Sequence, residues 1–121
     1  MPSQYGGQSQ ELALFASAAR TATANGATLE IPAGMRKVTS YLDVTAASGT
    51  SPTLVVKLQD SINAGTTWVD VDGGAHAQLT AAGESYITVL IRRAANAVRA
   101  VATIGGTTPS FTFSVDVVAS S

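Results

Sequence analysis

The sequence predicts an all-β protein, an antiparallel β-sandwich or jelly-roll-like fold of about eight or nine strands. Short segments in which apolar and polar residues alternate recur along the whole chain, and turn signals rich in Gly, Pro and Asn separate them. No segment shows a convincing helical period. The length of 121 residues suits one domain with one core.

The first ten residues consist mainly of Gln, Gly and Ser, a composition that does not support packing by itself. We therefore expect residues 1–10 to form a flexible N-terminal arm and residues 11–121 to form a single sandwich domain. The arm is either a disordered tail or a segment that becomes ordered only against a neighbouring subunit.

The segment 11–24 is ambiguous, because its alanines favour a helix while its alternation favours a strand. We predict a strand. Asn25-Gly26 is a strong hairpin signal, so residues 28–31 are expected to return as the second strand.

The centre of the chain predicts two strands joined by a turn. In residues 36–46, the side chains of Val38, Ser40, Leu42, Val44 and Ala46 share one face. A turn is predicted over residues 48–52, and a strand over 53–59 buries Leu54, Val56 and Leu58. Trp68 is expected to open the next strand, 68–72, and to cover one end of the core.

The C-terminal half predicts further strands at 84–92, 98–104 and 111–117. Residues 84–92 are apolar on both faces, as expected of a central strand or one covered by an interface. Phe111, Phe113, Val115 and Val117 alternate most regularly, after a loop predicted over 105–109. GTTPSF in this region echoes GTSPTL earlier; we interpret both as joints between a turn and a strand, without predicting an internal repeat.

Charged residues make up only 12% of the chain, about half the usual share, while 45% of the residues are hydrophobic. Such a surface suggests that much of the exterior contacts other protein. The net charge is -1 and the basic residues are scattered, which argues against nucleic-acid binding. There is no cysteine and no apolar run of membrane-spanning length, so we expect a soluble protein made in a cytoplasm.

Few residues suggest chemistry, and we expect neither catalysis nor a cofactor. His76 has no second histidine or cysteine to work with and is interpreted as an ordinary loop residue. Asp60, Asp70 and Asp72, with Asn63 nearby, are the candidates for an oxygen-ligand cation site, although the spacing does not match a calcium loop.

Two further groups are candidates for binding. Trp68, Tyr41 and Tyr86 are candidates for a platform on which a carbohydrate stacks, against the alternative that Trp68 packs on the core. Arg92 and Arg93 adjoin at a strand end and are candidates for a salt bridge to an acidic partner, against the alternative of a solvated strand end.

The run LDVTAASGTSPTLVVKLQDSINAGTTWVDV, together with ASAARTATANG and VRAVATIGGTTPSFTFSV, resembles small β-sandwich virion proteins of tailed bacteriophages. The resemblance extends over residues 14–117 and contains no catalytic motif. Similar sequences often have Asp-Gly before the tryptophan, whereas this chain has Asn63-Ala64-Gly65. The resemblance implies a virion component, on the head or on the tail.

The expected function is that of a capsid decoration protein, which binds the outside of the head and bridges capsid subunits. Its expected partners are the major capsid protein and further copies of itself, and its expected location is the capsid surface, after assembly in the bacterial cytoplasm. The expected contacts are Gln4, Tyr5, Gly6, Gly7 and Gln8 of the arm, with Arg92 and Arg93. The alternative is a carbohydrate-binding sandwich on a tail or fibre.

Overall fold

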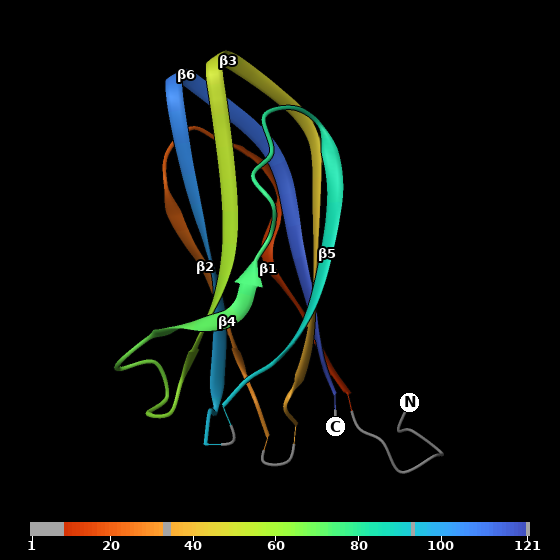
Figure 1. Ribbon diagram of the computed structural model, residues 1–121, viewed down its shortest axis with the longest axis vertical. Helices are drawn as coiled ribbons and strands as arrows, with labels where there is room; N and C mark the ends of the chain where they lie inside the picture. Colours follow the sequence, from red (N-terminus) through yellow and green to blue (C-terminus); the bar gives the residue numbers. More distant parts are fainter. Residues whose placement is uncertain (1–8, 33–34, 93, 121) are drawn as a thin grey trace.

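The computed structural model describes residues 9–32, 35–92 and 94–120, which form an antiparallel sheet of six strands (Figure 1). The strands are β1 (Ser9–Arg20), β2 (Ala24–Glu30), β3 (Lys37–Ser61), β4 (Val69–Ala75), β5 (Gly83–Leu90) and β6 (Ala97–Ser120). The all-β, antiparallel prediction is confirmed. The strand count is lower than expected, because segments predicted as separate strands are continuous.

The two longest strands, β3 and β6, pair with each other along their whole length and fold over together into two layers (Figure 1). In the first layer β1 pairs with residues 111–120 of β6, which pair with the first half of β3, and β5 pairs with the far side of β3. In the second layer β2 pairs with residues 97–102 of β6, and β4 with the second half of β3. Each layer therefore has four strand segments, although the chain has six strands.

The bend that joins the layers lies where turns were predicted, at residues 48–52 and 105–109. Gly49 and Gly106 have φ of 113° and 110°, and Ser51 and Thr108 have φ of 48° and 46°. Thr50 and Thr107 are partners at the centre of the bend. The turn signals were correct locally, but both strands bend side by side and keep pairing instead of ending.

The fold repeats itself, since β1, β2 and β3 correspond to β4, β5 and β6 about a pseudo-two-fold axis through this bend. β2 pairs with β6 just as β5 pairs with β3, and β1 pairs with β6 just as β4 pairs with β3. The loops show the same reciprocity: the N–H of Ile31 donates to the carbonyl of Asn96, and that of Ile91 donates to the carbonyl of Arg36. The echo between GTSPTL and GTTPSF thus marks equivalent positions of a structural repeat that the sequence analysis did not predict.

The core lies between the two layers and confirms most of the predicted alternation. The first layer contributes Val38, Leu42, Val44, Phe111, Phe113, Val115 and Val117, and the second contributes Leu54, Val56, Leu58, Val98, Ala100 and Ala102, all buried. Ala46, expected on the inner face of its strand, is exposed because the pairing of β3 and β6 shifts register between Val44 and Ala46. Leu14 and Phe15 are both buried although they are adjacent, since the pairing of β1 shifts there too.

The predicted hairpin after the first strand was wrong. Asn25-Gly26 does not form a hairpin turn, because it lies inside β2 and the chain reverses earlier, at residues 21–23. Of the two alternatives for residues 84–92, the structure excludes a central strand, because β5 is an edge strand of the first layer and ends at Leu90. The alternative of a strand covered by an interface stays a prediction. The residues expected to form the arm lie outside the described residues up to residue 8, and β1 already begins at Ser9.

Candidate interaction surface

Two tyrosines stand side by side on the outer face of the first layer. Tyr41 of β3 and Tyr86 of β5 are cross-strand partners, with ring centroids 5.8 Å apart and planes inclined by 31°. They are 50% and 70% exposed, and Leu90 on the same face of β5 is 65% exposed. Side chains of this size and polarity are typical of protein–protein contacts and of surfaces on which sugars stack.

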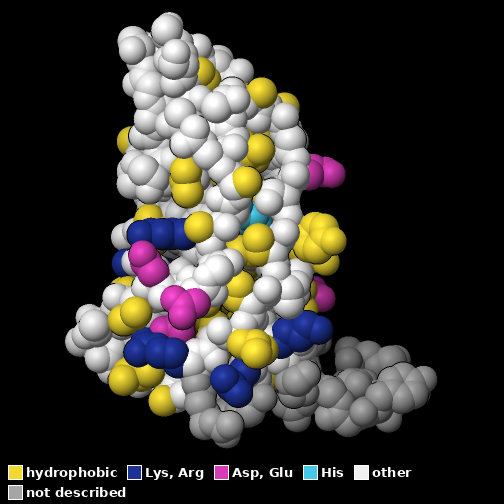
Figure 2. All heavy atoms as spheres, viewed as in Figure 1, with side chains coloured by type: hydrophobic (Ala, Val, Ile, Leu, Met, Phe, Trp, Pro, Cys, Tyr) yellow, Lys and Arg dark blue, Asp and Glu magenta, His cyan; other side chains and the backbone are white. Residues whose placement is uncertain are grey.

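Carboxylates adjoin the tyrosine pair. Asp43 is the cross-strand partner of Glu84, one step along the same face, and Asp116 of β6 is the partner of Tyr41 on its other side. The like charges of Asp43 and Glu84 lie directly opposite each other, which destabilises the pairing of β3 with β5 at this position. Figure 2 shows hydrophobic side chains protruding from the side of the molecule where β5 lies, with acidic side chains above and below them. We call the outer face formed by Tyr41, Asp43, Glu84, Tyr86 and Leu90 the tyrosine face.

A shallow cavity of about 400 Å³ opens on the tyrosine face, between β3 and β5. Its lining includes both tyrosines, Asp43 and Glu84. The cavity combines aromatic surface with carboxylate oxygens.

Most basic side chains of the described residues contact other residues of the same chain. Lys57 forms an ion pair with Asp70 at 3.1 Å, and Arg99 donates to Gln59. The guanidinium of Arg20 lies 4.8 Å from the ring centroids of both Phe15 and Phe113. Lys37, at the Leu90 end of the tyrosine face, makes no hydrogen bond or ion pair with any described residue. The carboxylates of the tyrosine face are therefore not neutralised by these cations.

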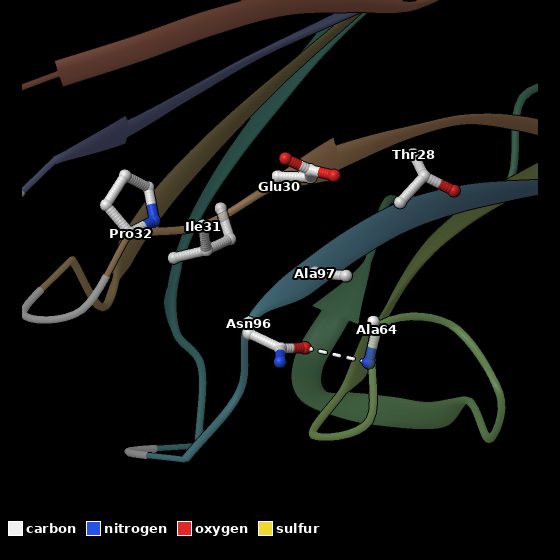
Figure 3. A pocket seen from close by; sticks show the side chains of 7 residues that line it. All are labelled: Thr28, Glu30, Ile31, Pro32, Ala64, Asn96 and Ala97. Carbon is white, nitrogen blue, oxygen red and sulfur yellow. Dashed lines mark hydrogen bonds between the residues drawn. The ribbon is translucent and has the colours of Figure 1, made fainter.

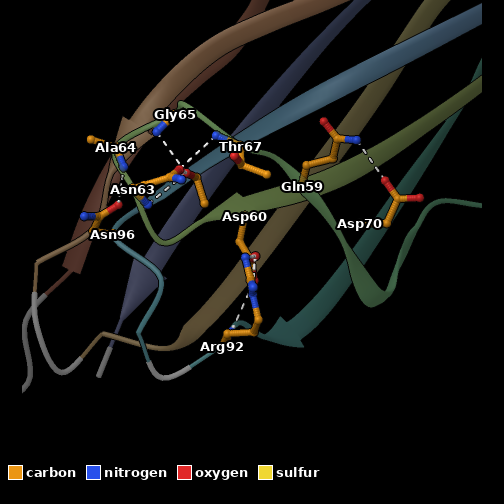
Figure 4. Close-up of polar contacts among 10 residues, drawn as sticks. Gln59, Asp60, Asn63, Ala64, Gly65, Thr67, Asp70, Arg92 and Asn96 are labelled. Atoms are coloured by element: carbon orange, nitrogen blue, oxygen red, sulfur yellow. Dashed lines mark hydrogen bonds and ion pairs between the residues drawn. The ribbon is translucent and has the colours of Figure 1, made fainter.

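Arg92, expected to contact a partner, binds Asp60 within the chain (Figure 4). Its Nε and Nη2 lie 2.7 and 2.6 Å from Oδ1 of Asp60, and its backbone N–H donates to Oδ2 at 3.2 Å. The Asp60 side chain is only 3% exposed, so this arginine is its counter-ion. The pair ties β3 to the end of β5. Arg93 and the residues Gln4, Tyr5, Gly6, Gly7 and Gln8 lie outside the described residues.

The three aromatic residues proposed as one platform do not come together. Trp68 lies just before β4, in the second layer, where the guanidinium of Arg99 sits 4.6 Å from its ring centroid. Trp68 is partly buried and is not among the side chains that pack against the core. Its partner Arg99 alternates with the buried Val98 and Ala100, so the indole lies on the outer face of its layer and does not cover an end of the core. Gly65 allows this position, because a Cβ there would lie 3.2 Å from the indole. The tyrosine pair is what remains of the predicted platform.

The loop before Trp68 is held by its asparagine (Figure 4). Oδ1 of Asn63 accepts from the N–H of Thr67 at 2.8 Å, and the Ser61 hydroxyl accepts from the N–H of Gly65 at 2.9 Å. Ala64 has φ of 57° and Gly65 has φ of 94°, so the three-residue sequence forms a wider loop than a tight Asp-Gly hairpin.

His76, interpreted from sequence as an ordinary loop residue, is buried and 2% exposed. Its Nδ1 lies 2.9 Å from the Ser85 hydroxyl and its Nε2 lies 3.0 Å from the Ser40 hydroxyl. Burial lowers the pKa of His76 from its ordinary value of 6.5. The imidazole is thus a neutral link between β3 and β5. The alternation in β3 predicted that Ser40 points inward. A buried hydroxyl requires a polar partner, and His76 is that partner.

The acidic residues considered for a cation site serve separate roles. Asp60 pairs with Arg92, and Asp70 accepts from Gln59 and Lys57, contacts that lower the pKa of Asp70. Within residues 9–32, 35–92 and 94–120, no group of three or more His, Cys, Asp or Glu is placed to hold a metal ion. In the same part of the chain, no helix is long and apolar enough to cross a membrane.

A second open cavity, of about 450 Å³, lies at the loop end of the sandwich, beside the end of β2 and the start of β6 (Figure 3). Asn96 closes one side by accepting the N–H of Ala64 on its Oδ1 at 3.0 Å. Among the described residues of its lining, Glu30 contributes the charged side chain. The described residues of this cavity include no cluster of catalytic or metal-binding groups.

No protein-family model and no curated protein matches the sequence. Solved structures do resemble the fold. YomS, derived from the SPBc2 prophage, is 13% identical with a TM-score of 0.55, and 95% of each chain is covered. The PBSX exported protein XepA is 14% identical with a TM-score of 0.60, over 91% of this chain and 36% of that one.

A chain from the structure of infectious bursal disease virus, Gx strain, is 9% identical with a TM-score of 0.64, over 95% of this chain and 32% of that one. This chain therefore spans about a third of the length of XepA and of the viral chain. At identities this low, the similarities show a shared sandwich fold.

Proposed function

We propose that this chain is a structural protein of a tailed-bacteriophage virion that decorates the head, binding the outside of the capsid and bridging its subunits. Three things support the proposal: the sequence resemblance, the prophage and viral chains that share the fold, and the tyrosine face. The tyrosine face carries it, because an exposed aromatic pair flanked by carboxylates that form no ion pair with a described residue is a surface suited to contact.

The proposed mechanism is multivalent bridging without catalysis. Each copy adds an interface that spans neighbouring capsid subunits, and this interface must break before the subunits separate. A folded-over sheet whose two halves are related by a pseudo-two-fold axis resists deformation, because both layers share β3 and β6. The partners in this proposal are the major capsid protein and further copies of the chain, and the location is the capsid surface.

Co-sedimentation of the full chain with purified capsids tests the proposal. The wild-type protein should saturate the shells at a fixed ratio to the major capsid protein, whereas Tyr86→Ser should weaken binding at least tenfold. Thr103→Ser, on the exposed face of the second layer, is the matched control and should bind as wild type. Binding that does not saturate, or equal binding of all three proteins, would contradict the proposal.

The second candidate is a carbohydrate-binding module of a tail or fibre. The cavity between Tyr41 and Tyr86 favours it, since aromatic rings stack on sugars and the carboxylates of Asp43 and Glu84 accept hydrogen bonds from hydroxyls. Glycan-array binding that Tyr86→Ala abolishes, without a change in stability, would support this candidate over capsid decoration.

A further inference from the structure

The edge of β5 differs from the other edges of the sandwich in its regularity. β5 pairs with β3 in unbroken register from Lys37↔Leu90 to Val44↔Gly83. The pairings of β1, β2 and β4 each contain at least one register shift. Register shifts twist an edge and hinder further pairing, whereas a long, flat edge invites another strand. Among the described residues, no strand pairs with the other side of β5.

β2 is the structural equivalent of β5 within the repeat, and its edge is less regular. β2 occupies the same place in the second layer, and its pairing with β6 shifts between Asn25 and Thr28. The two edges hold equivalent places by pseudo-symmetry, and of the two only β5 pairs without a register shift. No Pro or Lys, the residues that usually guard an edge, occurs in β5.

We propose that β5 is the site at which two copies of this chain associate, by antiparallel pairing of β5 with β5 of the second copy about Ile87. The inference rests on one part of the proposed function, the association of the chain with further copies of itself. It does not require that the chain binds a capsid. Pairing about Ile87 joins residues 84–90 of one copy to residues 90–84 of the other and keeps inward side chains opposite inward ones. Pairing about Tyr86 would give an overlap of the same length, and the charges at the two ends of the strand favour Ile87.

Charge complementarity indicates that the partner at the edge of β5 is a second copy of this chain. Within one chain, Lys37 lies beside Leu90 at one end of the tyrosine face, and Asp43 lies beside Glu84 at the other. Antiparallel pairing about Ile87 brings these ends into one row, in which Asp43 and Glu84 of one copy are followed by Leu90 and Lys37 of the other. Neighbouring strands are about 4.8 Å apart, so the Glu84 carboxylate and the Lys37 ammonium of the two copies reach each other across Leu90.

The apolar side chains fit the same arrangement. Ile87 is partly buried and packs against the core, and the two-fold axis would place it against its own counterpart. Leu90, 65% exposed in one copy, would lie beside the aliphatic part of Glu84 from the other. Pairing at the edge leaves the outer face open, so it would join two tyrosine faces into one broader surface.

Sedimentation equilibrium of the full chain over a range of concentrations tests the inference. The wild type should show a monomer–dimer equilibrium. Lys37→Glu should weaken dimerisation at least tenfold, and Lys37→Glu combined with Glu84→Lys should restore it, because the swapped charges again oppose. Thr88→Glu, next to the axis, should also weaken dimerisation at least tenfold, whereas Thr28→Glu on the equivalent edge of β2 should not. A wild type that stays monomeric, or a charge swap without rescue, would overturn the inference.

A disulfide test reads the register directly, since the chain has no cysteine of its own. Directly opposite residues of antiparallel strands have Cα atoms about 4.5–5.5 Å apart, which is within disulfide range. Ile87→Cys should therefore form a covalent dimer under mild oxidation much faster than Thr28→Cys. Equal rates for the two variants would overturn the inference. Neither experiment involves capsids, so a failure here leaves the decoration proposal to its own test.

Discussion

Gly49 and Gly106 each lie against the opposite strand at the bend, in equivalent contacts. A Cβ on Gly49 would come within 2.7 Å of the Thr108 carbonyl oxygen, and one on Gly106 within 2.7 Å of the Ser51 carbonyl oxygen. Both glycines also have positive φ. The backbones of β3 and β6 therefore approach so closely at the bend that each strand requires a glycine where the other crosses it.

Gly49→Ala should destabilise the fold by about 3 kcal/mol, because it adds a backbone clash to the strain of a positive φ. Gly73→Ala is the control: its φ is +70°, but a Cβ there has no atom within 4 Å. The control should cost only about 1 kcal/mol, from strain alone. Urea unfolding of both variants measures the difference, and equal losses would show that the close approach does not matter.

Arg92→Ala should lower the free energy of unfolding by about 2–4 kcal/mol, since it leaves the buried Asp60 carboxylate without its counter-ion. Lys57→Ala removes an exposed partner of Asp70 and should cost less than about 1 kcal/mol. Chemical denaturation compares the two. A loss for Arg92→Ala no larger than that for Lys57→Ala would mean that Asp60 does not depend on this arginine.

Acid should destabilise the protein through His76. Because burial lowers the pKa of His76 in the folded state, the unfolded chain binds the proton more readily. The contribution of His76 to stability is complete above pH 6.5 and is lost as the pH falls from 6.5 toward the lowered pKa of the folded state. Urea midpoints between pH 7.5 and 5.5 should fall for the wild type and change less for His76→Gln. A wild-type midpoint that stays constant would contradict the burial of a neutral imidazole.

Trp68→Ala and Tyr86→Ala should separate stability from binding. Trp68 packs against Arg99, so its removal should cost about 1–2 kcal/mol of stability. Tyr86 is 70% exposed, and its removal should change stability by less than about 0.5 kcal/mol while weakening capsid or glycan binding. Thermal unfolding and binding assays on the same preparations distinguish the roles. If Trp68→Ala weakened binding and left stability unchanged, Trp68 would serve binding and not stability.

The sequence predicted what depends on local alternation and missed what depends on distant partners. The buried rows Leu54, Val56, Leu58 and Phe111, Phe113 follow from a period of two, and the structure confirms them. The residue types at 48–52 predicted a turn. Whether the strand ends there depends on the strand that pairs with it, since Thr50 pairs with Thr107, 57 residues further along the chain. No local pattern carries that information.

Asn25-Gly26 shows how one signal can have two causes. Glycine after asparagine usually serves a hairpin, but here a Cβ on Gly26 would lie 2.6 Å from the Leu14 carbonyl oxygen and 3.0 Å from the Phe15 ring. The residue is small because β1 crosses closely over it. Similarly, the low share of charged residues predicted that part of the surface contacts other protein, but it did not predict where. That β5 is an edge strand follows only from the topology of the sheet.

The copy number of this chain in purified phage particles tests the central claim most directly. Quantitative mass spectrometry against the major capsid protein should give on the order of hundreds of copies per particle, as repeated sites on a symmetric shell require. Particles that lack the chain would contradict a role in the virion, and a handful of copies per particle would contradict decoration of the head.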